Sequence, residues 1–166
     1  GSVLSCLAMA RENARTTREV LPSEAWEVLN GAYHFVRDHA PTGVPRKARH
    51  TFVNRVVATC QELAGIYDGV LSRGPAYGFI QLGRHLERAD MSTRILDVAS
   101  APLLSADAAA TEDAPLENAL WLNVLRSLSA FQMYRQNVRD RVNPEDVLAF
   151  VLLDEDFPRS VSFCLE

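Results

Sequence analysis

The residues that could do chemistry gather in one stretch, residues 77–98, with the sequence YGFIQLGRHLERADMSTRILDV. Read with a helical period, this stretch has a polar lane whose members are three and four residues apart. The polar lane consists of Gly83, Glu87, Asp90, Arg94 and Asp97. Glu87 and Asp90 could act as an acid–base pair, because burial raises the pKa of one carboxyl group and leaves it able to carry a proton.

The same charges also have a structural interpretation. Asp90 and Arg94 are four residues apart, and Arg84 and Glu87 are three apart, spacings at which helical side chains form ion pairs. Arg88 falls with Arg84 among the apolar residues of the stretch. We favour a structural network over a ligand-binding pocket, and a pocket over catalysis. The candidate residues for either role are Arg84, Glu87, Arg88, Asp90 and Arg94.

Two apolar sides flank the polar lane. One side carries Phe79, Leu82, Leu86, Ala89 and Leu96, and the other carries Tyr77, Ile80, Met91, Ile95 and Val98. A helix that is apolar on two sides is usually buried on both, and buried charges need partners because they lose their water. The pattern therefore predicts a central helix with an ionic network inside a packed bundle.

A second charged stretch, ARENARTTRE, covers residues 10–19. Arg11 and Arg15 share a helical face, as do Glu12 and Arg15. One interpretation is a solvated helix end with weak ion pairs. The other is a surface that meets the polar lane, which makes Arg11, Glu12 and Arg15 further candidate site residues. Both interpretations stay open at this point.

Other kinds of site have little support. The four histidines lie on different segments and lack the spacing with carboxylates that zinc and di-metal sites use. The three cysteines have no histidine at a telling position, and no glycine-rich stretch is followed by the Lys-Ser/Thr of a phosphate-binding loop. We predict no metal, no cofactor and no catalytic residue. We accordingly favour a protein that is not an enzyme.

Composition limits the class of protein. The chain has 166 residues, of which 48% are apolar and 23% charged, as expected for one globular domain. A net charge of −4 argues against a nucleic-acid binder. No apolar run is long enough to span a membrane, and the odd number of cysteines without CxxC spacing is typical of reduced thiols. We expect a cytoplasmic protein that binds neither nucleic acid nor membrane.

The elements that must position the charged residues are all helical. Apolar periodicity, Pro and Gly turns and the Asn143-Pro144 start signal predict an all-α bundle of six or seven helices, mainly up-down, in a single domain over residues 1–166. Residues 100–115 are rich in Ala, Ser, Asp and Pro and are predicted to form a flexible loop. Helices are expected at about 3–20, 22–39, 47–71, 75–98, 116–138 and 144–153, followed by a break at 156–159.

The two ends of the chain contain a faint repeat. An offset of 144 residues aligns Val147 with Val3, Leu148 with Leu4, Arg159 with Arg15 and Leu165 with Leu21. We expect that the chain begins inside one repeat and ends early in the next. Apolar surface on residues 3–20 or 143–166 would then lack its natural cover, and we predict that it forms a homodimer.

A family resemblance rests on these same stretches. The segment GRHLERAD at residues 83–90, followed by Arg94, resembles the signature of the bacterial Alpha-E proteins, which are named for a helical domain with an ER motif. ARENAR at residues 10–15 and FPRSV at residues 157–161 are also similar to that family. The resemblance implies a helical unit that is usually duplicated in tandem. It also implies a role in bacterial peptide synthesis or modification, beside ATP-grasp-type ligases and transglutaminase-like proteins.

Two functional hypotheses follow. The first is a non-catalytic helical scaffold or partner module that serves an ATP-grasp-type ligase or a transglutaminase-like protein. The alternative is an enzyme, or an anion- or peptide-binding domain, that uses the polar lane with Arg11, Glu12 and Arg15 facing it. An enclosed and fully paired network favours the scaffold, and an open cleft with unpaired arginines favours the alternative.

Overall fold

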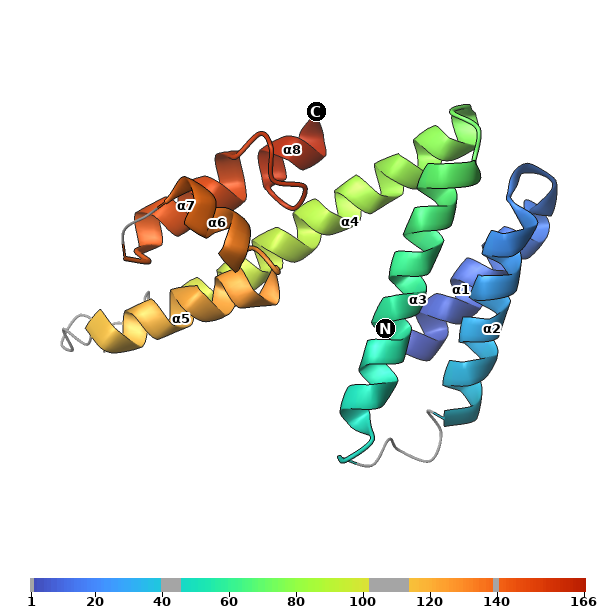
Figure 1. Ribbon diagram of the computed structural model, residues 1–166, viewed down its shortest axis with the longest axis horizontal. Coiled ribbons are helices and arrows are strands. Elements are labelled where there is room, and N and C mark those ends of the chain that lie inside the picture. The colour runs from blue at the N-terminus through green and yellow to red at the C-terminus, as the bar shows by residue number, and fades with distance from the viewer. Residues whose placement is uncertain (1, 40–45, 102–113, 139–140) are drawn as a thin grey trace. The chain divides into compact units, whose positions relative to one another are not determined.

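The computed structural model describes residues 2–39, 46–101, 114–138 and 141–166, and these residues contain helices and no strand (Figure 1). The predicted all-α class is confirmed, with eight α-helices and one 3₁₀ turn in the described residues, against the six or seven expected. The elements are α1 (Val3–Thr16), η1 (Arg18–Val20), α2 (Ser23–His39), α3 (Arg49–Val70), α4 (Pro75–Ser100), α5 (Ala114–Ser127), α6 (Phe131–Asn137), α7 (Pro144–Leu153) and α8 (Val161–Leu165).

The chain forms two compact units, Gly1–Phe79 and Ile80–Glu166, and helix α4 contributes to both. The single domain expected over residues 1–166 stays a prediction. None of the helices in the described part of the chain is both long and apolar enough to cross a membrane. The expected flexible loop falls mostly on 102–113, which lies outside the described residues.

In the first unit, α2 packs against both α1 and α3. Its buried residues are Ala25, Leu29, Ala32 and Val36, which recur every three or four residues as a core-facing stripe should. In helix α3, Thr59 is buried and Phe52 half-buried, whereas Val53 and Val70 are 48% and 61% exposed. A mostly apolar helix fits several lines of contact, and only the position of α2 selects one.

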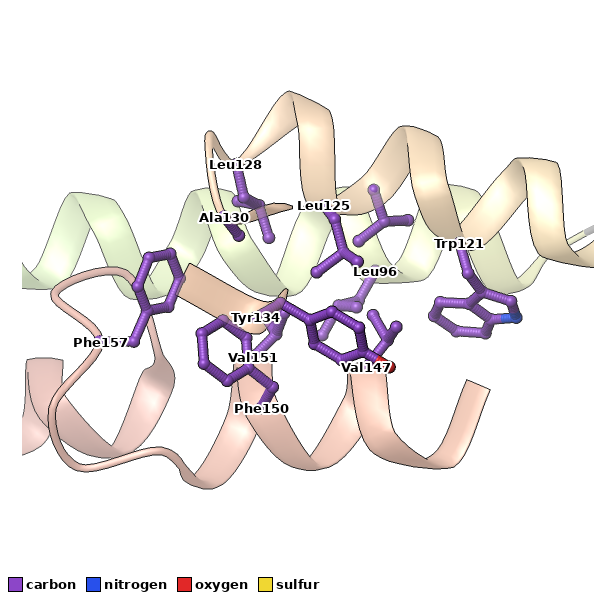
Figure 2. Packing of buried hydrophobic residues seen from close by; sticks show 11 residues of the cluster. Leu96, Trp121, Leu125, Leu128, Ala130, Tyr134, Val147, Phe150, Val151 and Phe157 are labelled. Carbon is purple, nitrogen blue, oxygen red and sulfur yellow. The ribbon is translucent and has the colours of Figure 1, made fainter. Parts of the chain in front are cut away.

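The core of the second unit joins the C-terminal part of α4 to α5, α6 and α7 (Figure 2). Trp121, Val124, Leu125 and Leu128 are at most 2% exposed. Tyr134 is fully buried and packs edge-on against Phe150, with ring centroids 5.7 Å apart. The whole cluster consists of Leu96, Trp121, Val124, Leu125, Leu128, Ala130, Tyr134, Val147, Phe150, Val151 and Phe157.

The helix expected to run from about 116 to 138 is instead two helices, α5 and α6. The break is a hydrogen-bonded helix end, in which the Ala130 N–H donates to Leu125 O at 2.7 Å and the Ser129 N–H donates to Arg126 O at 3.0 Å. Ser129 takes the left-handed conformation that this motif requires, with φ of 54°. The sequence does not indicate this helix end, because Gly is the usual residue at this position and residue 129 is Ser.

Helix α7 begins as predicted. The Asn143 side chain accepts a hydrogen bond from the Asp146 N–H at 2.8 Å, and Pro144 occupies the first turn, where its missing N–H leaves no donor unpaired. The chain then breaks after Leu153 and restarts at α8, as expected from the DFPR sequence at 156–159.

The prediction that α4 is buried on two sides is wrong. Its buried residues are Ser92 and Leu96 alone. The exposed apolar residues of α4 are Phe79, Leu82, Leu86, Met91 and Val98, with exposed fractions from 48% to 74%. Periodicity shows which residues of a helix would tolerate burial, but not how many neighbours reach it.

Candidate functional site

One face of α4 holds the backbone of the turn between α7 and α8. Arg88 Nη1 donates to the Pro158 carbonyl oxygen at 3.4 Å, and Ser92 Oγ donates to the Arg159 carbonyl oxygen at 2.7 Å. Residues 88 and 92 are one helical turn apart, so both side chains point the same way. Ser92 is 1% exposed. The arginine of the ER sequence thus binds a turn that lies 70 residues further along the chain.

The turn that Arg88 and Ser92 hold is itself fixed by side-chain hydrogen bonds. Asp154 Oδ1 accepts from the N–H groups of Asp156 and Phe157, at 3.0 and 2.7 Å. Ser160 Oγ donates to the Asp154 carbonyl oxygen and accepts from the Phe163 N–H at 3.1 Å, which caps α8. Phe157 is buried and stacks on a core ring, Phe150, with centroids 4.8 Å apart. The FPRSV sequence therefore forms a rigid junction between α7 and α8.

Two titratable groups lie beside this junction. The His85 ring stacks on Phe163 with centroids 5.8 Å apart, and burial, followed by the positive charges of Arg88 and Arg84, lowers the pKa of His85. Cys164 Sγ lies 3.7 Å from the Pro158 carbonyl oxygen. Burial raises the pKa of this thiol, with Arg88 opposing, so Cys164 is a poor nucleophile at neutral pH.

The polar lane lies on the exposed side of α4. Asp90 Oδ2 and Arg94 Nε are 2.8 Å apart, so this predicted pair is formed, with side chains 53% and 70% exposed. Arg84 Nη1 donates to Gln81 Oε1 at 3.3 Å, and the pair expected between Arg84 and Glu87 stays a prediction. Glu87 and Asp90 are both exposed, so the burial that the acid–base interpretation requires is missing. This network is on the surface and not enclosed, contrary to expectation.

The candidates Glu12 and Arg15 belong to the first unit and pair with each other. Arg15 Nε lies 2.9 Å from Glu12 Oε2, and Arg15 Nη2 lies 2.6 Å from Glu12 Oε1. The hydrogen bond from Arg15 lowers the pKa of Glu12, although both side chains are 55% exposed. This is the solvated ion pair of the first interpretation. The expectation that these residues face the polar lane concerns both units and stays a prediction.

The third candidate of that stretch, Arg11, has aromatic partners that sequence reasoning missed. Its guanidinium carbon lies 5.5 Å from the ring centroid of Trp26 and 5.1 Å from that of Tyr33. Its Nε donates to Asn30 Oδ1 at 2.7 Å. The signal was present in the sequence, because Trp26, Asn30, Tyr33 and Arg37 recur four, three and four residues apart along α2.

No group of three or more His, Cys, Asp and Glu side chains in the described residues is arranged to hold a metal ion. Comparison with known proteins gives one family match over residues 1–166. It is to Alpha-E, described as a predicted alpha-helical domain with a conserved ER motif. No curated protein matches the chain. No solved structure matches it either.

Proposed function

Since the chain belongs to the Alpha-E family, we propose that it is a non-catalytic helical scaffold in a bacterial peptide synthesis or modification system. Its partners in this proposal are an ATP-grasp-type ligase and a transglutaminase-like protein, in the cytoplasm. The scaffold presents the exposed side of α4 to these partners.

The observation that carries the proposal is that the two residues of the ER sequence have different surroundings. Arg88 donates to a backbone carbonyl of the α7–α8 turn, which is a structural task. Glu87, the residue before it, is exposed, as are Asp90 and Arg94 on the following turns. A charged and solvated stripe on a helix that is anchored from its other side is suited to recognising a partner protein.

The alternative function, an anion- or peptide-binding domain or an enzyme that uses the same lane, has one observation in its favour. Burial, followed by the positive charges of Arg88 and Arg84, lowers the pKa of His85, and the two arginines place cationic groups on this part of α4. In that case the lane binds a small anion or a peptide directly, without a protein partner.

The experiment is co-purification of the full-length native protein from its own bacterium. Wild type is compared with Glu87→Gln and with Glu62→Gln, a matched loss of one exposed carboxylate on α3. We expect wild type and Glu62→Gln to retain an ATP-grasp-type or transglutaminase-like partner, and Glu87→Gln to lose it while circular dichroism shows a folded protein. Arg88→Gln is expected to lower the melting temperature, because it releases the Pro158 carbonyl.

Two results would overturn the scaffold proposal. If folded Glu87→Gln retains the partner, the exposed side of α4 does not form the interface. Calorimetric binding of a small anion by wild-type protein, abolished by Arg94→Gln with no protein recovered, establishes the alternative.

A further inference from the structure

The first unit carries a row of alternating guanidinium groups and aromatic rings. The arginine–aromatic row consists of Arg18, Trp26, Arg11, Tyr33 and Arg37, contributed by η1, α2 and α1. Arg18 lies 4.9 Å from the Trp26 centroid, and Arg37 lies 6.0 Å from the Tyr33 centroid. Trp26 and Tyr33 are half-buried, so the row lies at the surface of the unit.

The guanidinium of Arg11 is held in place from three sides. Two rings contact it and Asn30 Oδ1 accepts its Nε hydrogen, which leaves its Nη groups as the remaining donors. An arginine that is stacked on an aromatic ring is pre-organised, so it loses less side-chain entropy when it binds a carboxylate with two parallel hydrogen bonds.

The charges along the row are unequally compensated. Arg37 pairs with Asp38 at 2.8 Å, and neighbouring Arg15 pairs with Glu12. Arg11 and Arg18 make no ion pair with any residue in the described ranges, although both lie within 5.5 Å of the Trp26 centroid. Two like charges beside one ring repel each other, and anionic groups bound to the two guanidinium groups relieve that repulsion.

We propose that Arg11 and Arg18, organised around Trp26, bind the carboxylates of an acidic segment of a partner protein. Arg11 and Arg18 lie beside the same ring, at 5.5 and 4.9 Å from the Trp26 centroid, and a segment that carries several carboxylates can pair with both guanidinium groups at once. An extended peptide places alternate side chains about 7 Å apart on one side, so acidic residues at alternate positions present such a set of carboxylates. Each ring already has two guanidinium groups within 6.0 Å, which makes it a poor platform for nucleic-acid bases.

This site goes beyond the proposed function, because it lies on the first unit and uses none of the residues of the polar lane. It also assigns Trp26 and Arg18 a binding role. The arginine–aromatic row and the exposed side of α4 can therefore be tested as partner sites independently of each other.

The test uses the full chain and a fluorescein-labelled peptide of ten residues that alternates Glu and Ser, with binding followed by fluorescence anisotropy. We expect saturable binding that Arg18→Gln weakens by roughly fivefold, since an exposed charge pair contributes about that factor. Arg11→Lys keeps the net charge but removes the planar fork, and we expect the same loss. Arg126→Gln, at an exposed position of α5, is the charge-matched control and is expected to bind as wild type does.

Circular dichroism melts confirm that each variant is folded before binding is compared. The proposal is overturned if the peptide does not bind saturably, or if Arg126→Gln weakens binding as much as Arg18→Gln does. Unchanged binding by folded Arg11→Lys would show attraction by net charge alone. Displacement of the peptide by inorganic phosphate, but not by sodium chloride of equal ionic strength, would assign the site to a small anion.

Discussion

At the scale of single residues, hydrogen bonds to main-chain carbonyl groups define the junction between α4 and the α7–α8 turn. Ser92 donates to the Arg159 carbonyl oxygen, and Arg88 donates to the Pro158 carbonyl oxygen, near which Cys164 Sγ also lies. Ser92 is the more important of the two by burial and distance, because it is 1% exposed and its hydrogen bond measures 2.7 Å. Removing a buried hydroxyl donor costs stability, because the hydrogen bond is lost from a position that water reaches poorly.

We therefore expect Ser92→Ala to lower the free energy of unfolding by about 1 to 3 kcal/mol. Urea denaturation followed by circular dichroism measures this difference. Thr93→Ala is the control, because exposed Thr93 bonds only to carbonyls of its own helix and Ala is the better helix former. Equal stability of Ser92→Ala and wild type would contradict the role given to this hydrogen bond.

His85 gives the junction a pH dependence. Its pKa is lowered below the ordinary value of about 6.5, first by burial and then by Arg88 and Arg84. As the pH falls through about 6.5, His85 of the unfolded chain binds a proton at a higher pH than His85 of the folded protein does. The contribution of His85 to the free energy of unfolding is therefore fully present above about pH 6.5 and is lost as the pH falls.

The measurement is the free energy of unfolding at pH 7.5 and at pH 5.5, for wild type and for His85→Gln. We expect wild type to lose more stability between the two values than His85→Gln does, because only wild type carries this titrating group. Parallel losses in the two proteins would show that His85 has an ordinary pKa in the folded state.

At the scale of elements, a single backbone conformation separates α5 from α6. Ser129 has φ of 54°, a conformation that costs a residue with a Cβ about 1 kcal/mol and costs Gly almost nothing. The hydrogen bonds of Ala130 to Leu125 and of Ser129 to Arg126 keep the chain in this conformation. The break lets Tyr134 enter the core beside Val147 and Phe150 (Figure 2).

We expect Ser129→Gly to raise the free energy of unfolding by up to about 1 kcal/mol, and Ser129→Val to lower it. Thermal unfolding by calorimetry compares both with wild type. Ser127→Gly is a useful contrast, because position 127 lies within α5, where Gly is unfavourable. If Ser129→Gly were destabilising by as much as Ser127→Gly, the left-handed conformation at 129 would be wrong.

At the scale of the whole molecule, the homodimer stays a prediction, and it concerns apolar side chains that are exposed near both ends of the chain. Residues 3–20, where uncovered apolar surface was predicted, include Met9 with 68% of its surface exposed. Residues 143–166 include Leu153 and Leu165, each 70% exposed. Apolar surface of this kind is commonly covered by association.

The prediction is that light scattering gives twice the mass of one chain at micromolar concentration. The double variant Leu153→Lys with Leu165→Lys should be monomeric, because each charge would have to be buried in the interface. A monomeric mass for the wild type over a wide concentration range would contradict the dimer.

The sequence predicted the local features of this protein well. Helix starts such as Asn143-Pro144 and the turn before α4 depend on neighbours within a few positions, and they agree with the structure. The pair of Asp90 with Arg94 was predicted for the same reason, since both lie on one helix. The family resemblance was likewise carried by contiguous stretches and matches the family found over 1–166.

The sequence could not show which helical faces are covered by other elements and which charged side chains pair with residues far along the chain. The same apolar periodicity describes a helix covered on one side or on two, so the exposure of Leu82 and Leu86 depends on elements far along the chain. Arg88 meets a carbonyl 70 residues away, and Arg11 meets rings on the next helix. Sequence determines local conformation through short-range hydrogen bonds and sterics, whereas burial and charge pairing depend on contacts that exist only after the helices have packed.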